Sequence, residues 1–295
     1  MRRFYALQSL VQVGKEISLG LVFACISPHG AEVIPELAGR MLDDFAVTRE
    51  GMRELVSLMK RQNPETIVLA TPHNLRLEGN IGVVTSEFTE GALRANAKMV
   101  ELRCACDRKL AKGILGKASE LELPVVGVNY GTSEGPASCM PMDWGTLIPL
   151  WFLVGRDNDD LKVVIVTPSR EIPLKELVSF GEVISEVTAA SEKRVAFVAS
   201  ADQGHAHRAD GPYGYNPASA EFDQLVKQAV QKNDLRPLLN LSSEFVENAK
   251  PDSLWQLAVL HGILERTRMV GHMLSYQTPT YYGMLCVSYL PTERK

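Results

Sequence analysis

Short runs of apolar, often β-branched residues recur along the chain and predict the strands of a buried sheet. They cover residues 19–27 (LGLVFACIS), 66–71 (TIVLAT), 124–129 (PVVGVN), 162–168 (KVVIVTP) and 194–200 (RVAFVAS). A continuous apolar run, in place of strict alternation with polar residues, is typical of a strand covered on both faces. We therefore expect these strands to lie inside the molecule.

Helical patterns lie between these runs. In residues 48–63, Met52, Leu55, Val56 and Met59 repeat at the spacing of one helix face, and Thr48 is a candidate N-cap. Near the end of the chain, DSLWQLAVLHGILE (252–265) predicts a buried helix and YYGMLCVSYL (281–290) a closing strand at an edge.

The alternation of strand and helix predicts the fold class. It favours α/β architecture, in one domain over residues 1–295, with a mainly parallel or mixed central sheet and helices on both faces. Residues 1–18 are a candidate N-terminal extension, because the strand pattern starts after them.

Composition argues against two classes of binding partner, nucleic acids and membranes. The chain has 31 Lys+Arg against 35 Asp+Glu, so no basic surplus points to nucleic acid. Its 5 cysteines contain no C-x-x-C pair, which fits reduced thiols in a cytoplasm. No apolar run approaches the ~20 residues of a membrane span, and polar residues interrupt any signal-peptide core near the start. We expect a cytoplasmic protein with neither a nucleic-acid nor a membrane partner.

Three histidines follow predicted strands. His29 and His73 come directly after Ser-Pro and Thr-Pro at two strand ends, and His205 lies five residues beyond a third. Ligands of open α/β sheets bind beyond the carboxyl ends of the strands, so these side chains could converge there. His207 is expected to point away from the site, because successive side chains of an extended segment point oppositely. His261 and His272 are expected to be satisfied core histidines.

Imidazoles in such a set favour metal chemistry. Two histidines and one carboxylate leave open positions on Fe(II) for substrate and O₂, and imidazole also suits Zn and Cu. Asp252, at the start of the predicted C-terminal helix, is a candidate carboxylate. From the sequence alone the favoured role of Asp252 is that of an N-cap that accepts a backbone N–H, and the two roles can coexist.

From about residue 20 to 290 the chain resembles the class III extradiol ring-cleavage dioxygenases, the superfamily of the catalytic subunit of protocatechuate 4,5-dioxygenase. Its most specific segment is SADQGHAHRADGPYGYNPASAEFD (200–223), supported by SPHG, TPHN, DWGTLIPLWFL (143–153) and YYGMLCVSY in the same order. The resemblance implies Fe(II) held by His29, His73 and a carboxylate of the C-terminal quarter, with His205 as the acid/base. The substrate implied is a catechol-like ring, which O₂ opens, and the assembly implied is a homo-oligomer, a dimer or larger.

The sequence departs from the family pattern at two places. Trp144 stands where many relatives have the His of Asp-His-Gly, so a second proton donor is missing. The carboxylate ligand of ring-cleaving relatives is usually Glu, whereas Asp252 is the best-placed residue here, with Glu244 and Glu247 as substitutes.

Several alternatives stay open from the sequence. Trp144, Tyr213 and Tyr215 are candidate aromatic walls for the substrate or, equally, core residues. The ring could belong to a vicinal diol, an aminophenol or a hydroxypyridone-like heterocycle. A zinc enzyme on the same scaffold, or a metal-binding protein without oxygenase activity, is the competing hypothesis.

Overall fold

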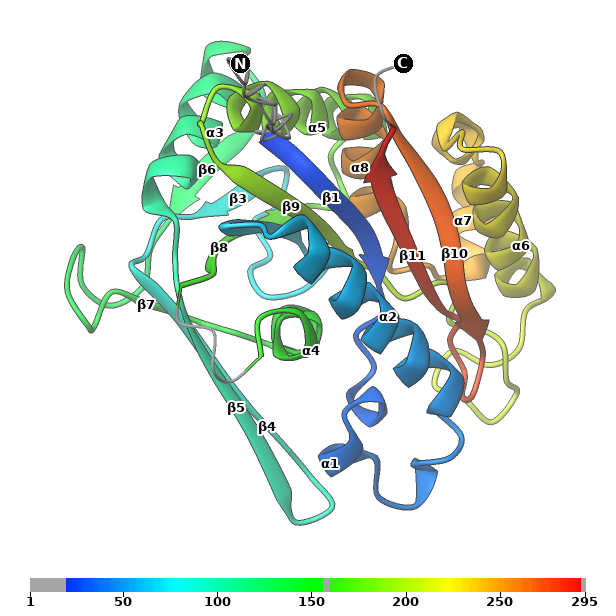
Figure 1. Ribbon diagram of the computed structural model, residues 1–295. Helices are drawn as coiled ribbons and strands as arrows, with labels where there is room; N and C mark the ends of the chain where they lie inside the picture. Colours follow the sequence, from blue (N-terminus) through cyan, green and yellow to red (C-terminus); the bar gives the residue numbers. More distant parts are fainter. Residues whose placement is uncertain (1–19, 156–159, 293–295) are drawn as a thin grey trace, which may run out of the picture.

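The computed structural model describes residues 20–155 and 160–292, and the candidate extension at residues 1–18 lies outside the described residues. An eight-stranded sheet forms the centre of the molecule (Figure 1), in the order β10-β11-β1-β9-β2-β8-β3-β6. Its strands are β1 (Gly20–Ser27), β2 (Thr66–Ala70), β3 (Ile81–Val84), β6 (Val125–Val128), β8 (Lys162–Pro168), β9 (Arg194–Ser200), β10 (Met269–Gln277) and β11 (Met284–Pro291).

The sheet is mixed. Strands β1, β9, β2 and β8 are mutually parallel, and β3 and β6 are parallel to each other. Antiparallel pairs join β10 to β11, β11 to β1 and β3 to β8. The expected α/β class with a mainly parallel or mixed sheet is therefore confirmed.

Two strands occupy other places than the sequence predicts. The closing strand β11 was expected at an edge but is internal and fully buried over most of its length, because β10 covers its outer side. Strand β6 was expected to be covered on both faces but forms the other edge, where Val126 is 41% exposed. An apolar run alone does not say how many neighbours a strand has.

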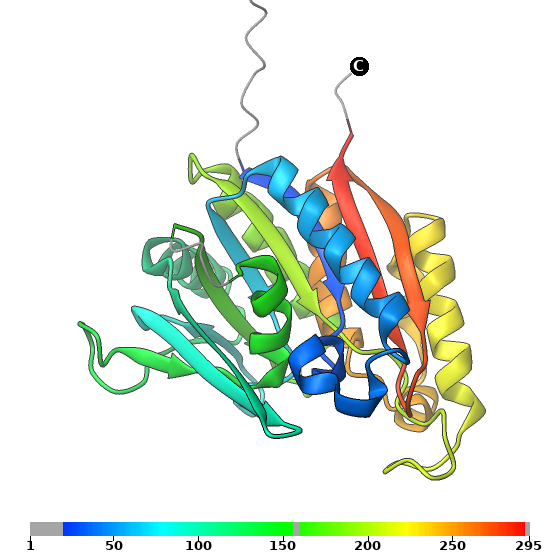
Figure 2. The same ribbon diagram turned by 60° about the horizontal axis from the view of Figure 1, so that its bottom comes forward.

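Helices cover both faces of this sheet, as Figures 1 and 2 show. Helices α3 (Arg108–Glu120), α5 (Leu174–Ala189), α6 (Pro217–Gln231) and α8 (Leu254–Arg266) contribute to one apolar core, with α7 (Ser243–Ala249) beside α6. Helices α2 (Ala46–Gln62) and α4 (Trp144–Leu153), with the short α1 (Pro35–Ala38), contribute to the core on the opposite face. Side chains of β1 divide between the cores, Ile26 on one side and Cys25 on the other.

A three-stranded sheet, β5-β4-β7, packs against α4 on the α2 side. It consists of β4 (Phe88–Ala95), β5 (Lys98–Ala105) and β7 (Cys139–Pro141). The β4–β5 hairpin extends away from the main sheet in Figure 1. Just after β7, Asp143 begins α4 by accepting the backbone N–H of Thr146 at 3.0 Å.

Two expected helix caps are wrong. Thr48 lies inside the first turn of α2, where its backbone N–H donates to Oε1 of Gln277 at 2.8 Å, and Phe45 occupies the cap position. Ser253, not Asp252, occupies the cap position of α8, and it makes no side-chain cap bond. The Asp252 carboxylate is therefore directed elsewhere.

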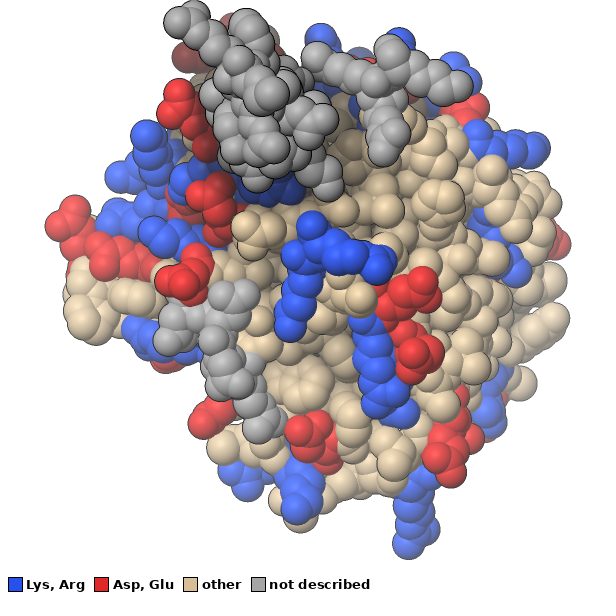
Figure 3. Space-filling view, viewed as in Figure 1, with Lys and Arg blue, Asp and Glu red and all other residues tan. Residues whose placement is uncertain are grey.

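Charges of both signs are mixed over the face drawn in Figure 3, with uncharged surface between them. Among the described residues, no helix is both long and apolar enough to cross a membrane.

Candidate metal centre

Three histidines meet at one edge of the sheet because the strands that carry them are neighbours. Strand β9 pairs in parallel with β1 on one side and with β2 on the other, so the carboxyl ends of all three point the same way. His29 follows β1, His73 follows β2 and His205 follows β9. The crevice beyond parallel strand ends is the usual ligand position in such sheets.

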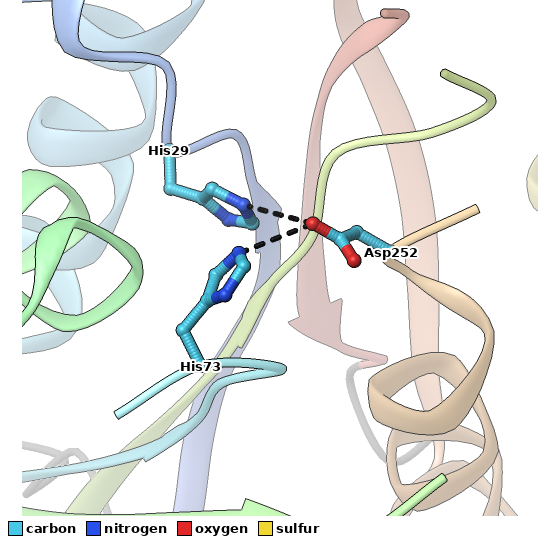
Figure 4. Close-up of side chains that lie close together, drawn as sticks. All are labelled: His29, His73 and Asp252. Carbon is cyan, nitrogen blue, oxygen red and sulfur yellow. Dashed lines mark hydrogen bonds and ion pairs between the residues drawn. The ribbon is translucent and has the colours of Figure 1, made fainter. Parts of the chain in front are cut away.

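Asp252 lies opposite these histidines and gives the cluster its carboxylate. Figure 4 shows the imidazoles of His29 and His73 pointing at its side chain. The Oδ2 atom of Asp252 is 3.1 Å from Nε2 of His73 and 3.7 Å from Nε2 of both His29 and His205. One potential ligand atom each from His29, His73 and Asp252 lies within 4.8 Å of the other two, so these residues could hold a metal ion.

A short hydrogen-bond chain fixes the ring of His29. The hydroxyl of Ser200 donates to the backbone carbonyl of Gly145 at 2.6 Å, because a carbonyl can only accept. Ser200 Oγ must then accept the Nδ1–H of His29, 3.0 Å away. In the neutral imidazole this leaves Nε2, on the Asp252 side, with its lone pair free for a ligand.

His205 is fixed in the same way. Its Nδ1–H donates to the backbone carbonyl of Gln203 at 2.7 Å, so Nε2 of the neutral ring carries the lone pair. The ring of Tyr282 stacks on the His205 imidazole with centroids 5.3 Å apart. The backbone N–H of His205 donates to the carbonyl of Ala249 at 3.0 Å, which ties the loop to the end of α7.

Asp202 adds a second, fully buried carboxylate. Its Oδ1 accepts the backbone N–H of His29 at 3.2 Å, and its Oδ2 lies 3.3 Å from Nε2 of the same residue. Burial raises the pKa of Asp202 above its usual value, against the opposing effect of the histidines. Burial lowers the pKa of His29, but the charges of Asp202 and Asp252 outweigh it and raise that pKa overall.

The charges of this cluster suit a bound cation. Burial would raise the pKa of Asp252, yet its interactions with His29 and His73 hold it well below the usual range. Where both imidazoles are neutral, their lone pairs face an ionised carboxylate, and a positive charge between them is favourable. A divalent metal would supply that charge, with two imidazole nitrogens and one carboxylate oxygen as its ligands.

Three residues of this cluster are absent from the sequence-based candidates. Asp202 stands three positions before His205 in the segment that carries the resemblance, so its place there was the available signal. Tyr282 lies just before β11, and only tertiary packing brings it to His205. Arg170, in the loop after β8, forms an ion pair with Asp252 and carries no sequence pattern that marks it.

The candidate aromatic walls take different positions. The ring of Trp144 lies 4.4 Å from that of His73 and is 47% exposed, and Tyr213 lies 6.0 Å from His205 and is 55% exposed. Tyr215 is 65% exposed and forms a backbone bridge with His207. The first two are therefore at the site, whereas Tyr215 is on the outer side of its loop.

Other candidates lie away from the cluster. His207 points to Asp223, with its Nε2 2.9 Å from Oδ2, and does not join the metal-ligand group. Glu244 and Glu247 are exposed on α7, where Glu247 pairs with Lys250. His261 is buried in α8, but His272, expected in the core, is exposed on edge strand β10.

Comparisons of this sequence and fold with known proteins identify a family. The family model described as the catalytic LigB subunit of aromatic ring-opening dioxygenase matches residues 23–286. Protein CA_C1420 of Clostridium acetobutylicum is 25% identical over 251 residues, which make up 85% of this chain and 53% of that protein. The chain thus spans about half the length of this curated relative.

A solved structure shares the fold. It is described as the crystal structure of uncharacterized protein JW3007 from Escherichia coli K12, and it matches with a TM-score of 0.62. The match covers 90% of this chain and 99% of that one at 16% identity. At that identity the likeness shows the fold alone.

Proposed function

Because the chain belongs to the family of the catalytic LigB subunit of aromatic ring-opening dioxygenases, we propose that it is an Fe(II)-dependent extradiol dioxygenase. The substrate class is a catechol-like ring: a vicinal diol, an aminophenol or a hydroxypyridone-like heterocycle. One observation carries the proposal, the group of His29, His73 and Asp252 with ligand atoms within 4.8 Å of one another.

The donor set suits Fe(II). Two imidazoles and one carboxylate are the protein ligands of many non-haem Fe(II) oxygenases, and they leave positions open for substrate and O₂. When bound, Fe(II) supplies the electron transfer between the aromatic ring and O₂ that the ring alone cannot make. His29, His73 and Asp252 would be its ligands.

His205 is the proposed acid/base. Its Nδ1–H donates to the backbone carbonyl of Gln203, so Nε2 is the atom that can take a proton from a ring hydroxyl. Nε2 lies 3.7 Å from Asp252 Oδ2, beside the ligand group without belonging to it. Stacking by Tyr282 holds the imidazole plane, so the base is positioned before the substrate arrives.

Aromatic residues would exclude water from the reacting ring. Trp144 on the His73 side and Tyr213 on the His205 side are exposed and could close over a flat substrate. Tyr215 is the weakest of the proposed substrate contacts, because its backbone bridge is to His207 on the outer side of the loop.

The test is oxygen consumption by the iron-loaded protein. Protein purified anaerobically and loaded with Fe(II) is mixed with air-saturated buffer and a panel of vicinal diols, aminophenols and hydroxypyridones. We expect O₂ uptake matched by the absorbance of a ring-opened product with at least one compound, and none after iron is removed. Iron bound at one per chain without uptake across the whole panel would contradict the proposal.

The competing proposal is a zinc enzyme or a metal-binding protein without oxygenase activity. It is favoured by Trp144, which places an indole next to His73 at 4.4 Å and offers no base there. Metal analysis of protein from cells grown with equal iron and zinc separates the two: a zinc-filled site that gains no O₂ uptake on exchange to Fe(II) supports this alternative.

A further inference from the structure

The two oxygens of the Asp252 carboxylate have different partners. Oδ2 faces the imidazoles, at 3.1 Å from His73 and 3.7 Å from His29. Oδ1 accepts a hydrogen bond from the guanidinium of Arg170. The carboxylate is thus held between the metal-ligand group on one side and a fixed cation on the other.

Arg170 is itself held in place by Trp255. The guanidinium lies over the Trp255 ring, 4.8 Å from its centroid, and the indole Nε1–H donates to the backbone carbonyl of Arg170 at 3.1 Å. Trp255 stands three residues after Asp252, in the first turn of α8. One helix end therefore carries both the carboxylate and the aromatic ring that orients the arginine.

We propose that Arg170 is a positioning residue that keeps Asp252 a one-oxygen metal ligand. It holds Oδ1 away from the metal position while Oδ2 faces the histidines, so the carboxylate does not use a position that substrate or O₂ needs. This inference rests on the proposed metal site and adds to it a residue that decides how many positions stay open.

Arginine suits this role for physical reasons. Its planar guanidinium can stack on an aromatic ring and donate to a carboxylate at the same time, whereas the ammonium of lysine is a compact point charge on a flexible stem. Hydrogen-bond partners of ligating carboxylates orient the ligand, and their loss typically reduces metal affinity about 10–100-fold. Half-exposed as it is, Arg170 can be replaced without opening a cavity in the core.

The experiment measures metal binding directly. Wild type, Arg170→Met and Arg170→Lys are titrated with Fe(II) under anaerobic conditions, and the visible spectrum of the Co(II)-loaded protein reports the coordination number. Arg208→Met is the matched control, because Arg208 is an exposed arginine whose ion pair is with Asp210. Removing its charge leaves the Asp252 carboxylate untouched.

We expect Arg170→Met to bind Fe(II) about 10–100-fold more weakly and to show an altered Co(II) spectrum as the second oxygen becomes free to coordinate. Arg170→Lys should lie between it and wild type, and Arg208→Met should match wild type. Unchanged affinity and spectrum in Arg170→Met would overturn the inference while leaving the metal site intact. Tighter binding would also overturn it, since charge repulsion would then outweigh positioning. A wild type that binds no metal would overturn both proposals.

Discussion

At the residue scale, the orientation of the site histidines depends on neighbours that can only accept a hydrogen bond. The carbonyl of Gly145 fixes the hydroxyl of Ser200 and through it the tautomer of His29, and the carbonyl of Gln203 fixes His205 directly. Each ring then presents Nε2 to the same carboxylate. Removing that carboxylate should affect the metal more than the fold.

We therefore expect Asp252→Ala to lose metal binding, because two neutral imidazoles alone do not balance a divalent charge in a buried site. Its carboxylate makes no helix-cap bond, so the variant should stay folded. Glu247→Ala is the control, since Glu247 is exposed and pairs with Lys250. Equilibrium dialysis against Fe(II) decides, and full occupancy in Asp252→Ala would move the ligand role to another residue.

His205→Gln should keep the metal and lose turnover. The amide cannot act as a base, and a positioned acid/base contributes about 10²–10⁴ in rate. His272→Gln, on the exposed edge strand β10, is the matched histidine control and should be unchanged. Metal content and single-turnover rates are measured together. Loss of the metal from His205→Gln would make His205 a ligand instead.

At the element scale, the start of α4 must approach the end of β2 closely. A methyl group at Gly145 would lie 2.6 Å from Oγ1 of Thr71 and 2.9 Å from Cδ2 of His73, which is shorter than van der Waals contact. Glycine at this helical position therefore lets α4 pack directly on a proposed ligand. The fold and the metal site share this contact.

Gly145→Ala should displace His73 and weaken metal binding by at least tenfold, while also destabilising the protein by about 1–3 kcal/mol through overpacking. Gly116→Ala is the matched control: Gly116 lies in α3, and a methyl group there meets nothing within 4 Å. That variant should be slightly more stable, by up to about 1 kcal/mol. Urea unfolding and metal titration of both variants would test this; equal behaviour would contradict the steric argument.

A second contact between elements gives a pH dependence. Asp107 caps α3 by accepting the N–H of Leu110 at 3.1 Å, accepts the Thr66 hydroxyl of β2 at 2.8 Å and pairs with Lys193 before β9. Burial opposes ionisation, but the hydrogen bond with Lys193 and the other donors lower the pKa of Asp107 below its usual value.

Because the folded pKa of Asp107 is depressed, its stabilising effect is complete above the unfolded pKa, roughly 3.9, and is lost as pH falls through the folded value. Asp107→Asn should thus be less stable than wild type by about 1.5–3 kcal/mol near neutrality, the usual range for hydrogen bonds to a charged group. The difference should shrink below roughly pH 4. Urea unfolding midpoints of both proteins from pH 7 to pH 3 measure this difference in stability. A difference that stays constant over this range would show that it does not come from the ionised Asp107 carboxylate.

At the scale of the whole molecule, the proposed ligands join two strand ends, those of β1 and β2, to the start of helix α8. His29, His73 and Asp252 are separated widely in sequence, so an ion bound to all three links segments from most of the chain. Such a site exists only in the folded state, and binding free energy then adds to folding free energy.

Metal should therefore raise thermal stability. With free Fe(II) at about 100 times its Kd, the added stability is about 2.7 kcal/mol, which corresponds to a shift of several degrees in a protein of this size. Thermal unfolding under anaerobic conditions, with and without a chelator, measures the shift. Asp252→Ala should show none; the same shift in that variant would place the stabilising metal elsewhere. Cytoplasmic location and homo-oligomerisation stay predictions.

Much of the fold could be predicted from the sequence. Continuous apolar runs marked β1, β2, β6, β8 and β9 to within a residue or two, because a strand inside a sheet needs several consecutive apolar residues. The order of the strands in the sheet was less accessible. Strand β10 covers the outer side of β11, and β6 forms the opposite edge; no local sequence pattern encodes either position. Thr48 failed as a cap because α2 begins at Ala46, which places Thr48 inside the first turn, where its backbone N–H donates to the distant Gln277.

The sequence by itself determined which chemistry was available, since Pro-His at two strand ends and the segment around His205 supply imidazoles after parallel strands. Tertiary structure alone decided how they are used. It turned Asp252 from a candidate helix cap into the partner of three imidazoles, brought Asp202 to His29, and placed Arg170 on the far oxygen of Asp252. The physical reason is that residue type fixes what a side chain can donate or accept, whereas the partner it meets depends on strand order and helix packing across the whole chain.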